Sequence, residues 1–283
     1  MNGAPVPRRL QYAVLAALSA LAMGLAWSRR WICDDAFISF RYAENFAAGQ
    51  GLVFNVGERV EGYSNFSWTL LCALAQLLGL DMEVFAQGLG IVCFGALVPV
   101  TAWAGSRLLR GDRTFLPLAA VGVVLHQHLQ DFASCGLETL GFVLLVTACT
   151  GVLAGAERPR SYAIASLLAV LAALTRPDGA LVGAVAGLVA VVASVRGRSL
   201  APAMAFAVPG FVLFVPFLAW RFLYYEDLLP NTFYAKSAHD PYLGQGWFYV
   251  RLFLNGYWVL WPAAVALPAL LLWRRTMGGL CVV

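Results

Sequence analysis

Residues 84–104 read VFAQGLGIVCFGALVPVTAWA and contain no charged side chain. A helix of this length rises about 30 Å, which is the thickness of the hydrocarbon core of a bilayer. Three arginines follow closely, at Arg107, Arg110 and Arg113. Because short cytoplasmic loops are enriched in arginine and lysine, the stretch predicts a transmembrane helix that ends at the cytoplasmic face.

The composition extends this prediction to the whole chain. Of its 283 residues, 61% are hydrophobic and only 12% are charged, and the mean hydropathy is +0.75. Soluble domains carry about 25% charged residues, so a water-soluble globular protein is excluded. The net charge of +4 comes with scattered arginines, which gives no basic patch for nucleic acid. The six cysteines form no CxxC or zinc-ligand spacing.

Seven more apolar runs resemble the first, and together they predict an all-α polytopic membrane protein with about eight transmembrane helices. The eight runs are 10–27, 84–104, 115–132, 140–153, 162–174, 180–195, 203–222 and 257–273. The run 64–80 is also apolar but short, and a crossing there would put the arginine clusters on both sides of the membrane. We therefore expect 64–80 to be an interfacial or re-entrant helix within an external loop, 28–83.

The charges then divide unevenly between the two faces. The cytoplasmic side holds 11 of the 19 basic residues but only Asp112 and Glu157 among the acids, so 13 of the 15 carboxylates lie outside. No small-residue cleavage site follows the first run, which predicts a retained helix rather than a signal peptide. Acidic chemistry is therefore expected on the external face.

The first external loop carries the most informative stretch, residues 33–49, CDDAFISFRYAENFAAG. It predicts a short helix along the membrane surface, with Asp35 as its N-cap and Gly49 at its end. Asp34 and Asp35 would then lie at the level of the lipid headgroups. A purely structural alternative is that one aspartate caps the helix and the other is solvated.

Each later external connection also carries polar residues. Glu138 begins a helix in 134–139, SCGLET, where the helix dipole would stabilise it. Arg176 and Asp178 interrupt apolar sequence in 175–179, TRPDG, and are costly there unless they line a wet cavity. The loop 223–256 contains 229–236, LPNTFYAK, with the chain's only lysine, Lys236, which could merely snorkel. Together these groups could hold a phosphate and deprotonate a hydroxyl.

The same motifs, in the same order, resemble bacterial GT-C glycosyltransferases, and most closely the actinobacterial terminal β-(1→2)-arabinofuranosyltransferases. The likeness lies in 34–42, DDAFISFRY, in 51–55, GLVFN, and in 57–66, GERVEGYSNF. Residues 136–139, 176–179 and 230–236 follow, and the likeness covers roughly 10–260.

This resemblance implies a single GT-C-like helical bundle, 1–283, with interfacial helices in its first external loop. It implies a multi-pass protein of the bacterial inner (plasma) membrane, among membrane lipids, with an active site that faces the periplasm or outside. The implied reaction moves a sugar, such as arabinofuranose, from a polyprenyl-phosphate donor to a glycan or lipid-linked acceptor. In the family a soluble C-terminal domain follows, and we expect this chain to be a truncated form without it.

The family pattern also suggests roles for individual residues. Asp34 or Asp35 would be the general base, and Glu138 would assist at the acceptor side or bind a metal. Arg176 and Lys236 would neutralise the leaving phosphate, and Asp178 would orient Arg176. Supporting roles are expected for Arg41, Glu61, Tyr63, Asn65, Asn231 and Tyr234. No cofactor is certain, no residue is assigned as a metal ligand, and a divalent metal stays open.

Two other functions are compatible with a membrane location. A transporter of lipid-linked sugars would predict inverted repeats, and the two halves of the chain show no such symmetry. A non-catalytic membrane assembly factor would share the loop motif without turnover. Cys33 and Cys135 flank the acidic motifs and could pair, but the spacing gives no geometry for a disulfide.

Overall fold

The structure, a computed structural model, describes residues 7–108, 117–227, 229–235, 242–258, 261–262 and 265–266, and every regular element in these ranges is a helix. The chain divides into two compact units, Met1–Thr232 and Phe233–Val283. The first holds α1 (Arg8–Ser28), α2 (Asp34–Ala47), α3 (Phe66–Leu77), α4 (Met82–Leu108), α5 (Leu118–Leu125), α6 (Gln127–Ala133), α7 (Thr139–Ala154), α8 (Pro159–Thr175), α9 (Gly179–Gly197) and α10 (Ala201–Tyr225). The short α11 (Asn231–Ala235) crosses the division, and α12 (Leu243–Gly256) belongs to the second unit.

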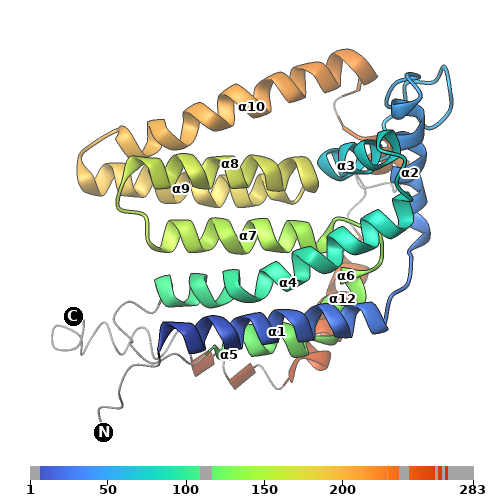
Figure 1. The fold of residues 1–283 in the computed structure, drawn as a ribbon. Coiled ribbons are helices and arrows are strands. Elements are labelled where there is room, and N and C mark those ends of the chain that lie inside the picture. Colours follow the sequence, from blue (N-terminus) through green and yellow to red (C-terminus); the bar gives the residue numbers. More distant parts are fainter. Residues whose placement is uncertain are drawn as a thin grey trace, which may run out of the picture. The chain divides into compact units, whose positions relative to one another are not determined.

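Six helices of the first unit lie side by side (Figure 1). Helix α4 packs between α1 and α7, while α8 contacts α7, α9 and α10. Four of the six, α1, α4, α9 and α10, are long and apolar enough to cross a membrane, and α7 and α8 are shorter apolar helices. They correspond to the predicted runs 10–27, 84–104, 140–153, 162–174, 180–195 and 203–222, which confirms an all-helical membrane protein.

The first residues of α1 and α8 and the last residues of α4 and α9, which include arginines, lie at one end of this unit, on the left of Figure 1. There the Arg107 guanidinium donates to the carbonyl of Gly155 at 2.8 Å, which joins the last turn of α4 to the end of α7. At the same end the Ser194 hydroxyl accepts a hydrogen bond from the backbone of Ala203 at 2.9 Å, which joins α9 to α10. The loop 28–83, predicted to be external, covers the opposite end with α2 and α3.

The predicted run 115–132 is not one continuous helix. It contains two short helices, α5 and α6, which meet at His126, whose backbone is extended. The His126 side chain accepts a hydrogen bond from the Leu129 backbone, so it caps α6 instead of continuing α5. Polar residues between His126 and Asp131 make this capped break feasible, because they offer partners to the freed backbone groups. The predicted eighth run, 257–273, lies largely outside the described residues.

The first external loop contains two helices, as predicted, and they pack on each other and on α4. Buried apolar side chains fill the contact: Ala36, Phe40, Ala43, Trp68, Cys72, Ala73 and Ala86. Helix α2 begins two residues earlier than predicted, since Asp34 is already helical, so Cys33 and not Asp35 is its N-cap. Gly49 follows the end of α2 with a φ of 76°, as a helix-terminating glycine does.

Tyrosines hold the rest of this loop against the end of α10. Tyr42 donates to the carbonyl of Val60 at 2.6 Å and accepts from the backbone of Gly62 at 2.7 Å. Tyr225 of α10 donates to the carbonyl of Leu52 at 2.8 Å, and its ring packs edge-on against Tyr63. The loop therefore has a fixed position relative to the helices behind it.

Candidate functional site

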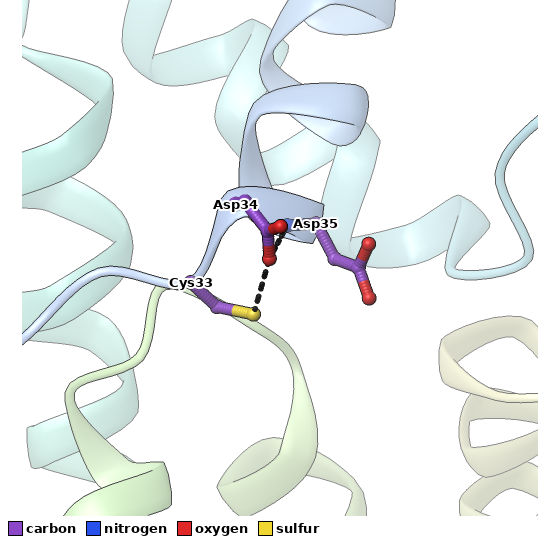
Figure 2. Close-up of side chains that lie close together, drawn as sticks. All are labelled: Cys33, Asp34 and Asp35. Carbon is purple, nitrogen blue, oxygen red and sulfur yellow. Dashed lines mark hydrogen bonds between the residues drawn. The ribbon is translucent and has the colours of Figure 1, made fainter.

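Asp34 and Asp35, at the first turn of α2, differ in their surroundings although both are exposed. Oδ1 of Asp34 accepts hydrogen bonds from the Asp35 backbone at 3.0 Å and from the Cys33 thiol at 3.4 Å. Figure 2 shows the Asp34 carboxylate turned toward Cys33 and the Asp35 carboxylate turned away from both neighbours. Asp34 is therefore part of the local turn, whereas Asp35 projects from the helix.

Glu138 is the buried carboxylate of this end of the bundle. It precedes the first residue of α7 and is only 6% exposed. Oε2 accepts a hydrogen bond from the Asn65 amide at 2.8 Å, and Oε1 pairs with Arg176 Nη1 at 3.3 Å. Both oxygens are thus occupied, one by a neutral donor and one by a cation, which allows the charge to be buried.

Arg176 connects this carboxylate to a second one. Its backbone is extended after the last turn of α8, and its Nη2 lies 3.1 Å from Oδ2 of Asp178. The sequence prediction that Asp178 orients Arg176 therefore has a geometric basis. Glu138, Arg176 and Asp178 together carry one negative charge. The positive charge of Arg176 is therefore already neutralised by these two carboxylates.

Asn65 extends the network to the first external loop. Its Oδ1 accepts hydrogen bonds from the hydroxyls of Ser39 on α2 and Thr69 on α3, each at 3.1 Å. Ser39, Asn65 and Thr69 are all buried. Asp35 precedes Ser39 by four residues, so the two lie on one face of α2, a single turn apart. Asp35 is therefore one helical turn away from the network that surrounds Glu138.

Two further contacts tie the same elements together. The Trp68 indole donates to the carbonyl of Gly136 at 2.9 Å, which fixes the turn before Glu138 to α3. The hydroxyls of Ser67 and Thr175 lie 2.8 Å apart, which joins α3 to the end of α8 beside Arg176. Ser39, Ser67, Thr69 and Thr175 were not singled out from the sequence, because isolated hydroxyl residues carry no motif.

A second ion pair lies behind this network. Arg221 of α10 donates through Nε to Oε1 of Glu61 at 2.9 Å and to Oε2 at 2.6 Å, and both side chains are at most 10% exposed. Burial raises the pKa of Glu61, and Arg221 opposes that rise only in part. Burial also raises the pKa of Tyr42 and Tyr63 nearby. Arg221 was missed from the sequence because it lies inside an apolar run, where no loop motif marks it.

A cavity of about 180 Å³ adjoins the Glu61–Arg221 pair. Glu61 and Arg221 lie in its wall, together with Ser64, which adjoins Asn65, and Pro177, which adjoins Arg176. The remaining wall is almost entirely apolar and comes from α3, α8, α9, α10 and the turn before α11: Phe66, Ala173, Leu174, Ala180, Phe214, Phe217, Leu218, Leu229 and Pro230. The site thus combines a charged region with an apolar pocket.

One group of His, Cys, Asp and Glu side chains in the described part of the chain could hold a metal ion. The ligand atoms of Cys33, Asp34 and Asp35 lie within 4.8 Å of one another. Two carboxylates and a thiol are a sparse set for Mg²⁺ or Ca²⁺, which prefer six or more oxygen ligands. Both oxygens of Glu138 are used by Asn65 and Arg176, so nothing in its contacts favours the metal-binding role considered for it.

The remaining predicted residues divide between the two units. Arg41 pairs with Glu44 at 3.5 Å on the exposed face of α2, and the Asn231 backbone donates to the carbonyl of Glu61 at 2.8 Å. Tyr234 is exposed and belongs to the second unit, and Lys236 lies outside the described residues. The structure therefore brings together Glu138, Arg176, Asp178, Asn65, Glu61 and Tyr63 with α2, which carries Asp35.

Two curated proteins are similar to this chain over most of its length. The terminal β-(1→2)-arabinofuranosyltransferase of Mycobacterium tuberculosis is 32% identical over 259 residues, which cover 86% of this chain and 41% of that protein. The protein of the same name from Corynebacterium glutamicum is 31% identical over 288 residues, or 92% of this chain and 41% of the relative. The resemblance noted in the motifs is thereby confirmed.

The chain spans about two fifths of the length of these curated relatives. No family model matches the chain, and no solved structure matches it.

Proposed function

We propose that this chain forms the membrane-embedded core of a glycosyltransferase that acts at the outer face of the bacterial plasma membrane. The donor is a polyprenyl-phosphate sugar, for which the relatives' name favours arabinofuranose. The acceptor is a hydroxyl of a glycan or of a lipid-linked saccharide. The observation that carries the proposal is the buried Glu138, around which α2, α3, α7, α8 and α9 meet.

In this reaction the acceptor oxygen forms a bond to the anomeric carbon of the donor while the bond from that carbon to the phosphate oxygen breaks. The hydroxyl proton passes to Asp35, and the electron pair of the broken bond leaves with the polyprenyl phosphate. Asp35 suits this role better than Asp34, because Asp34 already accepts two hydrogen bonds within its own turn. Glu138 acts as the fixed acceptor for Arg176 and for Asn65, and Asn65 in turn contacts Ser39 of α2.

The cavity supports a lipid-linked donor. Its phenylalanines, leucines and prolines suit the first isoprene units. The cluster of Arg176, Glu138 and Asp178 has a net negative charge, and Arg221 is already paired with Glu61. We therefore propose that Lys236 adds the positive charge that the leaving phosphate requires.

The test is transfer of a radiolabelled pentose from a synthetic polyprenyl-phosphate arabinofuranose to an arabinan oligosaccharide, catalysed by membranes that contain the chain. We expect transfer above that of membranes without it, and a loss of about 100-fold in Glu138→Gln, which leaves Arg176 without its buried partner. Glu44→Gln, on the solvent side of the same helix α2, is the matched control and should stay close to wild type.

Donor binding with no transfer to any acceptor would replace the proposal with a non-catalytic assembly role. Movement of the labelled donor across sealed vesicles without transfer would replace it with transport.

A further inference from the structure

Two cysteines are neighbours in space where the loop 28–83 meets the turn before Glu138. The backbone N–H of Cys33 donates to the carbonyl of Cys135 at 2.9 Å. Antiparallel residues that exchange two such bonds have Cα atoms about 5.5 Å apart, and one such bond keeps two residues at a similar separation. A disulfide requires Cα atoms between about 4.4 and 6.8 Å apart, so the two backbones are already at bridging distance.

A second close contact involves Gly136, the residue after Cys135. Gly136 has a φ of 85°, and a side chain there would meet Ile32 at 2.6 Å and Ala36 at 3.1 Å. The turn 134–138 therefore lies directly on the segment 32–36, with Cys33 and Cys135 as neighbours inside the contact. Figure 2 shows Cys33 beside this turn.

We propose that Cys33 and Cys135 form a disulfide bond in the mature protein. This inference rests on the outward orientation given under the proposed function, since disulfides persist on the oxidising side of a membrane. In the reduced structure the Cys33 thiol donates to Asp34 and the Cys135 thiol donates to the carbonyl of Phe132 at 3.3 Å. Rotation of the two side chains would exchange these weak contacts for the covalent bond.

The oxidant is an extracytoplasmic disulfide, either of a thiol–disulfide oxidoreductase or of a small molecule. The Cys33 thiolate attacks one sulfur of that disulfide and expels the other as a thiolate, because Cys33 is the more accessible of the two. The Cys135 thiolate then attacks the Cys33 sulfur and expels the second thiolate. The two cysteines lose two protons and two electrons, and the oxidant becomes two thiols.

The disulfide would stabilise the arrangement of the site residues as well as the fold. Cys33 is the residue before Asp34, and Cys135 is three residues before Glu138. A covalent link between them fixes the first turn of α2, with Asp35, against the start of α7, with Glu138. Burial raises the pKa of Cys33 and raises that of Cys135 to about 11, so reduced thiols here would react slowly and the oxidised pair would exchange slowly.

The test is differential alkylation of the full chain, purified without reductant from a host in which it is inserted in the plasma membrane. The denatured protein is treated with N-ethylmaleimide before and after reduction, and its peptides are analysed by mass spectrometry. We expect Cys33 and Cys135 to be alkylated only after reduction, and a linked peptide pair in the unreduced digest. Cys72, Cys93 and Cys149 should react before reduction. Alkylation of Cys33 and Cys135 without reductant would overturn the proposal.

Stability gives an independent reading. Cys33→Ser, Cys135→Ser and the double variant should all lower the apparent melting temperature by the same amount, about 3 °C or more, because each removes one bond. Reductant should lower the melting temperature of the wild-type protein by the same amount and leave the melting temperatures of these variants unchanged. Cys149→Ser, which alters a buried cysteine of α7, should keep the wild-type response to reductant. If the two single variants lost different amounts of melting temperature and the double variant lost their sum, the disulfide would be contradicted.

Neither measurement requires turnover. A disulfide in an inactive chain would leave this inference standing and remove the proposed function, whereas an active chain with two free thiols would do the reverse.

Discussion

Glu61 and Arg221 bury opposite charges in the wall of the cavity, and their contributions to stability should be unequal. Burial raises the pKa of Glu61 despite the pairing with Arg221, so desolvation of the carboxylate outweighs the attraction. Glutamine at position 61 removes the desolvation cost of the carboxylate and keeps an oxygen that can accept from Arg221, whereas removal of the arginine leaves a carboxylate buried without its cation.

Arg221→Gln should cost about 3 kcal/mol of folding stability at pH 8, and Glu61→Gln about 1 kcal/mol or less. A carboxyl group whose pKa is higher in the folded than in the unfolded state favours folding as the pH falls. Arg221→Gln should therefore regain melting temperature between pH 8 and pH 5, relative to wild type. Thermal unfolding of the detergent-solubilised variants measures both effects. The reverse order of the two costs would show that the attraction dominates.

Single residues also mark the limit of sequence interpretation. Arg176, Asp178 and Glu138 could be selected because each is a charge beside a turn in apolar sequence. Asn65 was placed among the supporting residues, but its central position between Ser39, Thr69 and Glu138 depends on contacts up to 73 residues apart. Arg221 could not be selected as a site residue from the sequence. Within an apolar run, the sequence does not distinguish a functional arginine from one that merely snorkels to the interface.

At the scale of elements, the connection between α8 and α9 determines where Arg176 and Asp178 lie. Gly179 begins α9 so close to α8 that an added Cβ would overlap the backbone of Ala172 and Ala173. Only glycine allows this approach, and the two charged residues directly precede it.

Gly179→Ala should therefore displace the start of α9, cost about 1 to 3 kcal/mol, and reduce transfer activity by about tenfold through misplacement of Arg176. Gly183→Ala is the control one turn further along α9, where the nearest atom is the Ala169 Cβ at 4.0 Å, an ordinary contact. It should leave both stability and activity near wild type. Equal effects of the two substitutions would reject the packing explanation.

Hydropathy located most helices of the first unit but not the break between α5 and α6. The run 115–132 is apolar enough for one helix, and only the hydrogen bond from Leu129 to the His126 side chain reveals the break. Helices α11 and α12 were likewise missed inside the loop 223–256, because a hydropathy window registers apolar length and not helical conformation.

At the scale of the whole molecule, most carboxylates of the first unit gather at the end that holds α2 and α3, whereas arginines occur at both ends and dominate the opposite one. The sequence predicted this separation from loop charges, and Figure 1 shows the corresponding ends of α1, α4, α8 and α9 together. Which end faces the cytoplasm is a prediction from the arginine rule.

Single-cysteine variants in intact cells test that orientation. A cysteine in place of Glu58, exposed in the first external loop, should react with a membrane-impermeant maleimide. A cysteine in place of Ser199, exposed between α9 and α10, should react only after the cells are permeabilised. The opposite pattern would reverse the topology and place Asp35 and Glu138 in the cytoplasm.

The central claim is that Asp35, held one turn from the Ser39 end of the Glu138 network, accepts the proton of the acceptor hydroxyl. The most direct measurement compares transfer rates of Asp35→Asn and Asp34→Asn, at equal amounts of protein in the membrane. We expect Asp35→Asn to lose about 1000-fold or more and Asp34→Asn to lose about tenfold or less, since Asp34 shapes the turn. A wild-type rate for Asp35→Asn would contradict the account.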